Sequence, residues 1–244
     1  MLTLSSSQLV TLWERGLEQH PVDKALTLLS AVYPDMTRDE LAALSVGQRD
    51  ARLLAIHENL FGPSLKSVTE CPQCAAPLEF ALNVRELQSA VDATPSAPPS
   101  ELASGDVWLR FRSLNSEDLA LISSCPDVST ARRVLVDRCV LESQQAGSDV
   151  PVEELPEEII EKLANRLGTI DSQADTLVEL HCVACSHHWE LMLDIVSFLW
   201  IEINVLAKRL LREVHRLAWA YGWRETDILA MSAVRRQFYL DMVE

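Results

Sequence analysis

Apolar residues recur every three or four positions over much of this chain, which is the spacing of helices with one buried face. Near the N-terminus the pattern predicts helices over residues 5–19, 21–33 and 45–60, with serines available as caps at two of the starts. The longest stripe predicts a helix over 196–221, and shorter helices over 225–231 and 233–242 follow. The members of this stripe are Leu199, Ile203, Leu206, Leu210, Val214 and Leu217.

Four short segments alternate apolar and polar residues instead, which is strand periodicity. We expect strands at 78–82, 107–111, 177–180 and 189–193, and an extended stretch at 68–70. The remaining helices are expected over 84–91, 116–125, 129–141 and 156–167, and 143–152 is expected to be a loop. Residues 92–105 are rich in proline and small polar residues, so we expect a linker or a long loop there.

Two Cys-x-x-Cys pairs change this picture: Cys71 with Cys74, and Cys182 with Cys185. Each pair places two thiols on one side of a tight turn, and two such turns facing each other complete a tetrahedral site of four sulfurs, which zinc favours. The two segments also align without a gap at an offset of 111 residues, and in each a strand and a helix follow the cysteines. The repeat predicts two halves of one zinc ribbon holding structural Zn²⁺. Four buried thiols held by packing alone are the alternative.

Sulfur would fill every position around such an ion, so the ion could not activate water, and the site indicates architecture rather than catalysis. The chain has no glycine-rich phosphate loop, no Gly-x-Ser-x-Gly and no His-Glu-x-x-His. We therefore expect a binding or assembly protein and not an enzyme.

Other candidate residues have simpler interpretations. The three histidines near the second cysteine pair are expected to be turn residues or donors to the thiolates, with metal ligation as the alternative. Lone cysteines are expected to fill the core, with a catalytic nucleophile as the alternative. The acidic run is expected to be a solvated helix face, with a carboxylate pair as the alternative, and the two helical histidines are expected to lie at or near the surface. The three histidines are His181, His187 and His188, and the lone cysteines are Cys125 and Cys139. The acidic run consists of Glu153, Glu154, Glu157, Glu158 and Glu161. The two helical histidines are His57 and His215.

The formal net charge of −15 opposes binding to nucleic acid and to anionic membranes, because affinity for both comes largely from Lys and Arg. The acid is concentrated in residues 142–194, with twelve Asp and Glu against two Lys and Arg, whereas 205–244 is slightly basic. No signal peptide is visible in residues 1–8, and the most apolar stretch, 191–201, is too short to span a membrane. We expect a cytoplasmic protein whose cysteines are thiols or metal ligands.

Together these patterns predict a mainly α protein with a small β zinc ribbon. We expect a helical N-terminal unit over 1–63 and the two ribbon halves over 64–91 and 175–195. An insertion over 92–174 would separate the halves, and 196–244 would form a C-terminal segment of one long helix and two short ones.

Several segments resemble the T4-like baseplate protein family of contractile phage tails and contractile injection systems. The resemblance is diffuse, and residues 92–155 take no part in it. It is carried by Leu12-Trp13-Glu14-Arg15-Gly16, Pro21-Val22-Asp23-Lys24-Ala25-Leu26, Leu60-Phe61-Gly62-Pro63, Cys71-Pro72-Gln73-Cys74, Leu78-Glu79-Phe80, Glu213-Val214-His215, Tyr221-Gly222-Trp223, Asp227-Ile228-Leu229-Ala230-Met231 and Arg235-Arg236.

The resemblance implies a structural or assembly role in a baseplate, either as a resident component or as an assembly chaperone. Its partners would be other baseplate, hub, tube or spike proteins, in the cytoplasm of the producing bacterium and in the finished particle. Aromatic residues near the C-terminus, Tyr221, Trp223, Phe238 and Tyr239, are candidate contact residues, with core packing as the alternative. A zinc-ribbon regulator of transcription or nucleic acid is the second hypothesis, and an enzyme with an unrecognised site is the third.

Overall fold

The computed structural model describes residues 3–87 and 99–243, and this part of the chain divides into two compact units. The first unit joins Met1–Thr37 to Asp194–Glu244, and the second is Arg38–Leu193. Both contain helices, whereas the strands belong to the second unit. The fold is thus mostly helical with small antiparallel sheets, as the sequence predicts. No helix of the described residues is long and apolar enough to cross a membrane.

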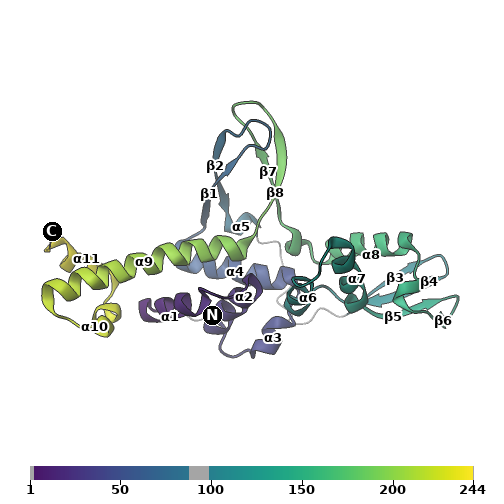
Figure 1. Cartoon of the computed structure of the whole chain (residues 1–244), viewed down its shortest axis with the longest axis horizontal. Coiled ribbons are helices and arrows are strands. Elements are labelled where there is room, and N and C mark those ends of the chain that lie inside the picture. Colours follow the sequence, from purple (N-terminus) through teal and green to yellow (C-terminus); the bar gives the residue numbers. More distant parts are fainter. Residues whose placement is uncertain (1–2, 88–98, 244) are drawn as a thin grey trace. The chain divides into compact units, whose positions relative to one another are not determined.

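The first unit is built on α9 (Ile195–Tyr221), the long helix in Figure 1. It has the predicted apolar stripe and ends at Gly222, which is in the left-handed conformation. Two helices that precede α9 in the sequence pack on it: α1 (Ser6–Gly16) and α2 (Pro21–Val32). The two helices that follow α9 in the sequence, α10 (Glu225–Ala230) and α11 (Ala233–Asp241), also pack on it. These five helices confirm the predicted ones, with differences of a few residues at their ends.

A buried ion pair joins three of these helices. Arg236 of α11 is 3% exposed, and its Nε donates to Glu213 Oε2 of α9 at 2.7 Å. The same guanidinium donates to the Ser6 hydroxyl at 3.3 Å and to the Met231 carbonyl at 3.0 Å. A guanidinium this deeply buried is tolerated because acceptors satisfy its N–H groups. The C-terminal helices are therefore fixed to α9 by a directional contact as well as by apolar packing.

The second unit begins with α3 (Arg38–Ala42) and α4 (Val46–Phe61), followed by the hairpin of β1 (Ser64–Glu70) and β2 (Pro77–Asn83). Ser45 caps α4 as predicted. Strand β1 is longer than the three extended residues expected at 68–70. Helix α5 (Val84–Leu87) starts where predicted, and the rest of the helix expected over 84–91 lies outside the described residues.

The insertion contains a four-stranded antiparallel sheet of β3 (Ser100–Ser104), β4 (Val107–Phe111), β5 (Val140–Gln145) and β6 (Ser148–Asp149). Its helices are α6 (Ser116–Ile122), α7 (Val128–Cys139) and α8 (Glu157–Ile170), with short 3₁₀ turns η1 (Val152–Glu154) and η2 (Ser172–Asp175). Its core joins α8 to one face of β4. The buried members are Val107, Leu109, Phe111, Leu155, Ile159 and Leu163.

Two loop predictions are wrong in this insertion. Residues 100–104, expected within a linker, form β3, and residues 143–149, expected in a loop, contain the end of β5 and all of β6. Both strands close two-residue hairpins: Gly105 (φ +64°) begins the first turn, and Ala146 (φ +51°) and Gly147 (φ +81°) form the second. Strand β3 is held by pairing with β4, and β6 by pairing with β5. Both strands are short and polar, so their alternation is not recognisable in the sequence. The remaining predicted linker residues, 92–98, lie outside the described residues.

Polar contacts attach the insertion to the start of α4. Both carboxylate oxygens of Asp171 accept there: Oδ1 from the Ser45 hydroxyl at 2.9 Å and Oδ2 from the Gly47 N–H at 3.0 Å. The N–H of Val46 donates to the Leu114 carbonyl at 2.9 Å. A carboxylate at this place satisfies free N–H groups of the helix and is favoured by the helix dipole.

A second carboxylate, that of Asp118, forms buried ion pairs within the insertion. Asp118, in the first turn of α6, is fully buried and accepts from Arg112 at 2.6 and 2.9 Å and from Arg138 at 2.5 Å. Burial alone would raise the pKa of Asp118, but the two guanidinium groups and the N–H of Asn115 lower it below its ordinary value. The charged form of Asp118 thus links α6, α7 and the end of β4.

Candidate metal centre

The two cysteine pairs lie at the tips of two hairpins with the same register. In the first, β1 pairs with β2 so that Glu70 lies opposite Pro77. In the second, β7 (Leu177–His181) pairs with β8 (His188–Met192) so that His181 lies opposite His188. Adding 111 to the pairs from Lys66–Ala81 to Glu70–Pro77 gives the whole register of the second hairpin, so the repeat seen in the sequence is a repeat of structure (Figure 1).

The turns that carry the cysteines are equivalent in detail. The N–H of Ala75 donates to the Cys71 carbonyl at 2.8 Å, and the N–H of Ser186 donates to the Cys182 carbonyl at 2.9 Å. Ala75 (φ +57°) and Ser186 (φ +61°) both occupy the left-handed region, which non-glycine residues rarely adopt. The same uncommon backbone in both turns aims two sulfurs from each turn to one side.

The four sulfurs converge on one point. Cys71 Sγ lies 3.6 Å from Cys185 Sγ, and Cys74 Sγ lies 3.6 Å from Cys182 Sγ. All four sulfurs lie within 4.8 Å of one another. Zn–S bonds of about 2.3 Å in a tetrahedron place sulfurs about 3.8 Å apart, whereas a disulfide needs about 2.05 Å. The spacing therefore fits four ligands around one ion, and all six cysteines of the chain are free thiols.

Backbone N–H groups around the site favour ionised sulfur. N–H groups of Cys185 and Ala184 lower the pKa of Cys182 to about 6. The pKa of Cys185 moves to about 12: the N–H of His187 lowers it, but burial and the three neighbouring sulfurs raise it further. The sulfurs therefore compete for negative charge, and a bound dication relieves that competition, because it stabilises every thiolate at once.

Burial divides the four ligands into an inner and an outer pair. Cys71 and Cys182 are 2% and 1% exposed, whereas Cys74 and Cys185 reach solvent. The inner pair comes from the first position of each turn and the outer pair from the last. An ion at the centre would have four sulfur ligands and no vacant position, so the arrangement supports a structural metal site.

The nearby histidines stand outside this cluster. His181 stacks on His188 with ring centroids 4.4 Å apart, and His187 stacks on Trp189 at 5.8 Å. The group of potential ligands found among the described residues contains the four cysteines and no histidine. The expectation that the histidines are turn residues or donors to the thiolates holds for His187, which lies in the turn and whose backbone N–H lies against Cys185. His181 and His188 instead belong to the strands β7 and β8.

The remaining candidates are placed as expected, with two exceptions, Cys125 and His57. Cys125 was expected to fill the core but is only half-buried and lies outside a helix. Cys139 is fully buried, and burial followed by the nearby Asp118 charge raises its pKa to about 12, which suits a core residue and not a nucleophile. His215 is exposed, and the five acidic residues of 153–161 are exposed. The surface assignment of His57 is wrong: it is fully buried, because it lies one helical turn after Leu53 on the inner face of α4.

Sequence reasoning overlooked the residues just after each cysteine pair. Ala75 and Ser186 fix the turns, and the N–H groups of Ala76 and His187 lie against the outer sulfurs Cys74 and Cys185. The offset of 111 pairs Ala75 with Ser186 and Ala76 with His187, so the alignment contained this signal.

Comparisons of the chain with protein-family models, with curated proteins and with solved structures found no match.

Proposed function

We propose that this chain is a structural or assembly protein of a contractile-tail or injection-system baseplate, and that it acts by binding other proteins. The observation that carries the proposal is a cluster of aromatic residues at the C-terminal end of the first unit. We call Tyr221, Trp223, Phe238 and Tyr239 the C-terminal aromatic group.

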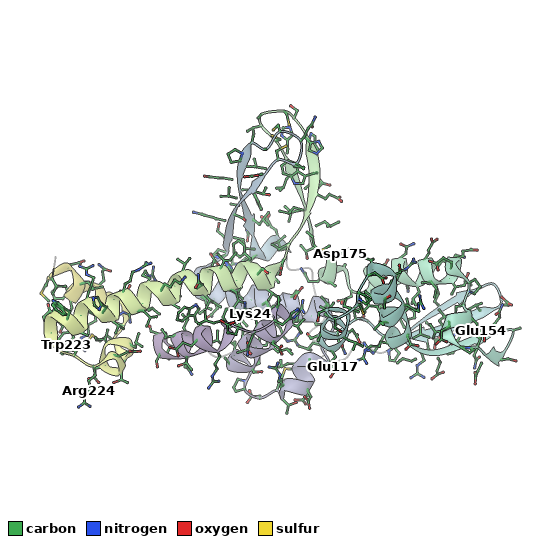
Figure 2. All side chains as sticks on the ribbon, viewed as in Figure 1. Lys24, Glu117, Glu154, Asp175, Trp223 and Arg224 are labelled. Carbon is green, nitrogen blue, oxygen red and sulfur yellow. The ribbon has the colours of Figure 1, made fainter. Side chains whose placement is uncertain are left out.

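Rings of this group contact one another while leaving apolar surface in water. Tyr221 stacks on Trp223 at 4.4 Å, and Tyr239 meets Trp223 edge-on at 4.8 Å. Phe238 is 64% exposed, and on the last turn of α9 Trp219 is 87% exposed. Figure 2 shows Trp223 and Arg224 at this end of the unit. Exposed aromatics beside arginine are typical of protein contact surfaces, because they supply large area at low entropy cost.

The baseplate assignment rests on the resemblance, and the structure places most of the resembling segments in one unit. Residues 12–16 lie in α1 and residues 21–26 in α2, and the segments between 213 and 236 lie in or between α9, α10 and α11. Glu213 and Arg236 both belong to segments that carry the resemblance, and they form the buried ion pair of the first unit. Gly16 also belongs to a segment that carries the resemblance, and it lies against Trp200, where a Cβ would come within 2.1 Å of the indole ring. These residues shape the unit that carries the C-terminal aromatic group.

Zinc at the cysteine cluster is the second part of the proposal. The four sulfurs would hold Zn²⁺ and join the two ribbon halves, and no step of chemistry would take place on the ion. Binding metal in this way adds stability to the folded chain, because the unfolded chain offers no preformed site. One zinc per chain, measured by atomic emission on protein purified without added metal, is the expected result.

Co-purification tests the protein-binding role. A tagged chain, produced in the bacterium that makes the particles, is expected to capture tail or baseplate proteins identifiable by mass spectrometry. Phe238→Ala is expected to reduce that capture about tenfold while leaving the fold intact, because this side chain lies mostly in solvent. Val128→Ala, an equally simple change at a side chain 85% exposed in the second unit, is the matched control.

Capture of no tail protein by the wild-type chain would contradict the proposed function. Equal capture by wild type and Phe238→Ala would instead remove the C-terminal aromatic group as the contact surface. The nucleic-acid alternative predicts a different result, a salt-sensitive shift of DNA or RNA in a gel at low salt. The net charge of −15 opposes that outcome.

A further inference from the structure

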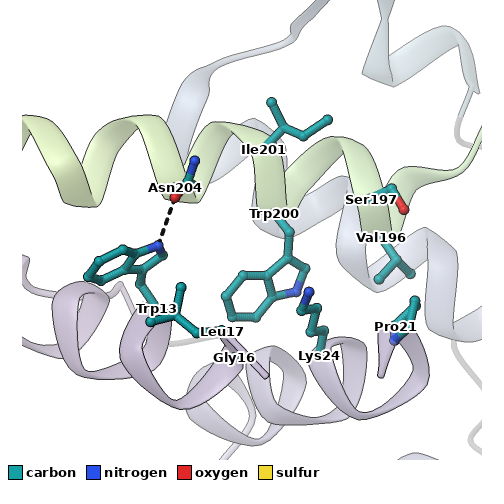
Figure 3. A pocket seen from close by; sticks show the side chains of 10 residues that line it. All are labelled: Trp13, Gly16, Leu17, Pro21, Lys24, Val196, Ser197, Trp200, Ile201 and Asn204. Carbon is teal, nitrogen blue, oxygen red and sulfur yellow. Dashed lines mark hydrogen bonds between the residues drawn. The ribbon is translucent and has the colours of Figure 1, made fainter. Parts of the chain in front are cut away.

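A pocket of about 420 Å³ opens between α1, α2 and α9 within the first unit (Figure 3). This volume lies in the range of about 300–1,000 Å³ that small-molecule and side-chain sites occupy. Its walls are mainly apolar, with two tryptophans, a leucine, a proline, a valine and an isoleucine. The polar lining side chains are Lys24, Ser197 and Asn204.

Trp200 forms the floor and carries an unsatisfied donor. The side chain is 8% exposed, and its indole Nε1 is buried with no hydrogen-bond partner in the described structure. A buried N–H without an acceptor costs about 1–3 kcal/mol, so such groups are rare in folded proteins. Trp13 offers a comparison in the same pocket, because its Nε1 donates to Asn204 Oδ1 at 3.0 Å.

A positive charge lies near this ring. The Lys24 ammonium is 5.8 Å from the centroid of the Trp200 ring, and both side chains line the pocket (Figure 3). Among the described residues no carboxylate forms an ion pair with Lys24. Two donors, one of them charged, therefore line this mainly apolar pocket, and the Trp200 N–H has no acceptor within the described residues.

The pocket is held in shape by close packing. A Cβ on Gly16 would lie 2.1 Å from Trp200 Cη2, so the absence of a side chain at position 16 lets the indole lie flat on α1. The hydrogen bond between Trp13 and Asn204 fixes the opposite wall. These contacts orient the Trp200 N–H before any ligand arrives.

We propose that this pocket binds the carboxyl terminus of a partner protein that ends in an apolar residue. The terminal carboxylate would accept from the Lys24 ammonium and the Trp200 N–H, and the apolar side chain would lie against Trp13 and Leu17. A carboxylate suits the two donors because it has two oxygens and a full negative charge. A neutral apolar ligand would leave the Trp200 N–H unpaired, and a cationic ligand would be repelled by Lys24.

A chain end is the occupant that the surroundings favour. The pocket is open on one side, so the rest of a polypeptide can leave it without threading, and capture of a terminal carboxylate is a recurring mode of peptide recognition. The site is separate from the C-terminal aromatic group, so the proposal stands or falls independently of the capture experiment above.

Peptide titration of the full-length chain tests the proposal. The probe is a fluorescein-labelled hexapeptide, Gly-Ser-Gly-Ser-Ala-Leu, prepared with a free carboxylate and, separately, with a C-terminal amide, and fluorescence anisotropy reports binding. We expect saturable binding of the acid and at least tenfold weaker binding of the amide. Lys24→Gln is expected to weaken the acid about tenfold and to leave the amide unchanged. Lys208→Gln, which removes an exposed lysine of α9 in the same unit, is the control and is expected to change neither.

Three results would overturn the proposal. Equal affinity for the acid and the amide would show that no carboxylate is recognised. Unchanged binding of the acid by Lys24→Gln, with circular dichroism like that of wild type, would place the peptide elsewhere. Decanoate that displaces the acid peptide at a lower concentration than the unlabelled peptide would identify a free amphiphilic carboxylate, and not a chain end, as the ligand.

Discussion

Removing one outer sulfur from each ribbon half tests whether the cysteine cluster stabilises the fold. Cys74→Ser with Cys185→Ser is the informative pair, because both side chains reach solvent and their loss creates no cavity. The metal would join positions separated by the 107 residues between Cys74 and Cys182. Closing a loop of this length removes chain entropy worth about 5 kcal/mol at 25 °C. The insertion has its own core, and if it stays folded when the ribbon opens, the effective loop shortens and the gain falls to about 3 kcal/mol.

Urea unfolding at pH 7 with equimolar zinc, followed by circular dichroism, measures this difference. The double variant is expected to lose about 3–5 kcal/mol of unfolding free energy and its bound zinc. Cys125→Ser, at a half-buried thiol outside the cluster, is the control, and it should retain the wild-type unfolding free energy and the bound zinc. A double variant within about 0.5 kcal/mol of wild type would refute the loop argument, since that is the range of neutral surface changes. Zinc-free wild-type protein of the same stability would favour four thiols held by packing alone.

Two further predictions concern contacts inside the second unit. Asp118→Asn is expected to cost about 3 kcal/mol at pH 7, because two guanidinium groups lose a buried partner. Since the folded pKa of Asp118 is lowered from 3.8, this stability is present above that pH and is lost as the pH falls through the folded value. Urea midpoints of the two proteins should therefore converge in acid; a constant difference down to pH 2 would contradict the assignment. Gly47→Ala is expected to cost about 2 kcal/mol in the same assay, because a Cβ would lie 2.2 Å from Asp171 Oδ1 and would break its hydrogen bonds. Gly168→Ala, in open space on α8, should instead stabilise by about 0.5–1 kcal/mol, and equal losses from both changes would refute the close contact.

The sequence predicts elements well where periodicity is long or where chemistry is local. The stripe of α9, from Leu199 to Leu217, spans about five turns, and each Cys-x-x-Cys pair carries its two ligands within four residues. Both are therefore recognised without tertiary information. Strands β3 and β6 were missed because each is short and polar and depends on a neighbour for its hydrogen bonds. The Ser-Gly-Asp-Val segment at 104–107 did contain a two-residue hairpin signal.

Contacts between distant residues were the part that sequence could not supply. Periodicity identifies the buried face of α1 and of α9, but it does not say that these faces meet. For the same reason, Trp200 and Lys24 gave no sign of a pocket, since their proximity depends on how two helices pack. Asp171 likewise reads as an ordinary loop residue, and only the fold brings it to the start of α4. His57 was misplaced because charged neighbours in sequence do not share its helix face.

The division of the chain separates architecture from recognition in a way that experiments can use. All four cysteines of the cluster belong to the second unit, whereas the C-terminal aromatic group and the pocket at Trp200 belong to the first. The residues that shape the two binding surfaces thus belong to a different unit from the metal ligands. If the metal acts only on stability, the double cysteine variant should retain the affinity of the pocket for the acid peptide at temperatures where it remains folded. A loss of that affinity would mean instead that the ribbon influences the first unit, and the metal would then have a role in recognition as well as in folding.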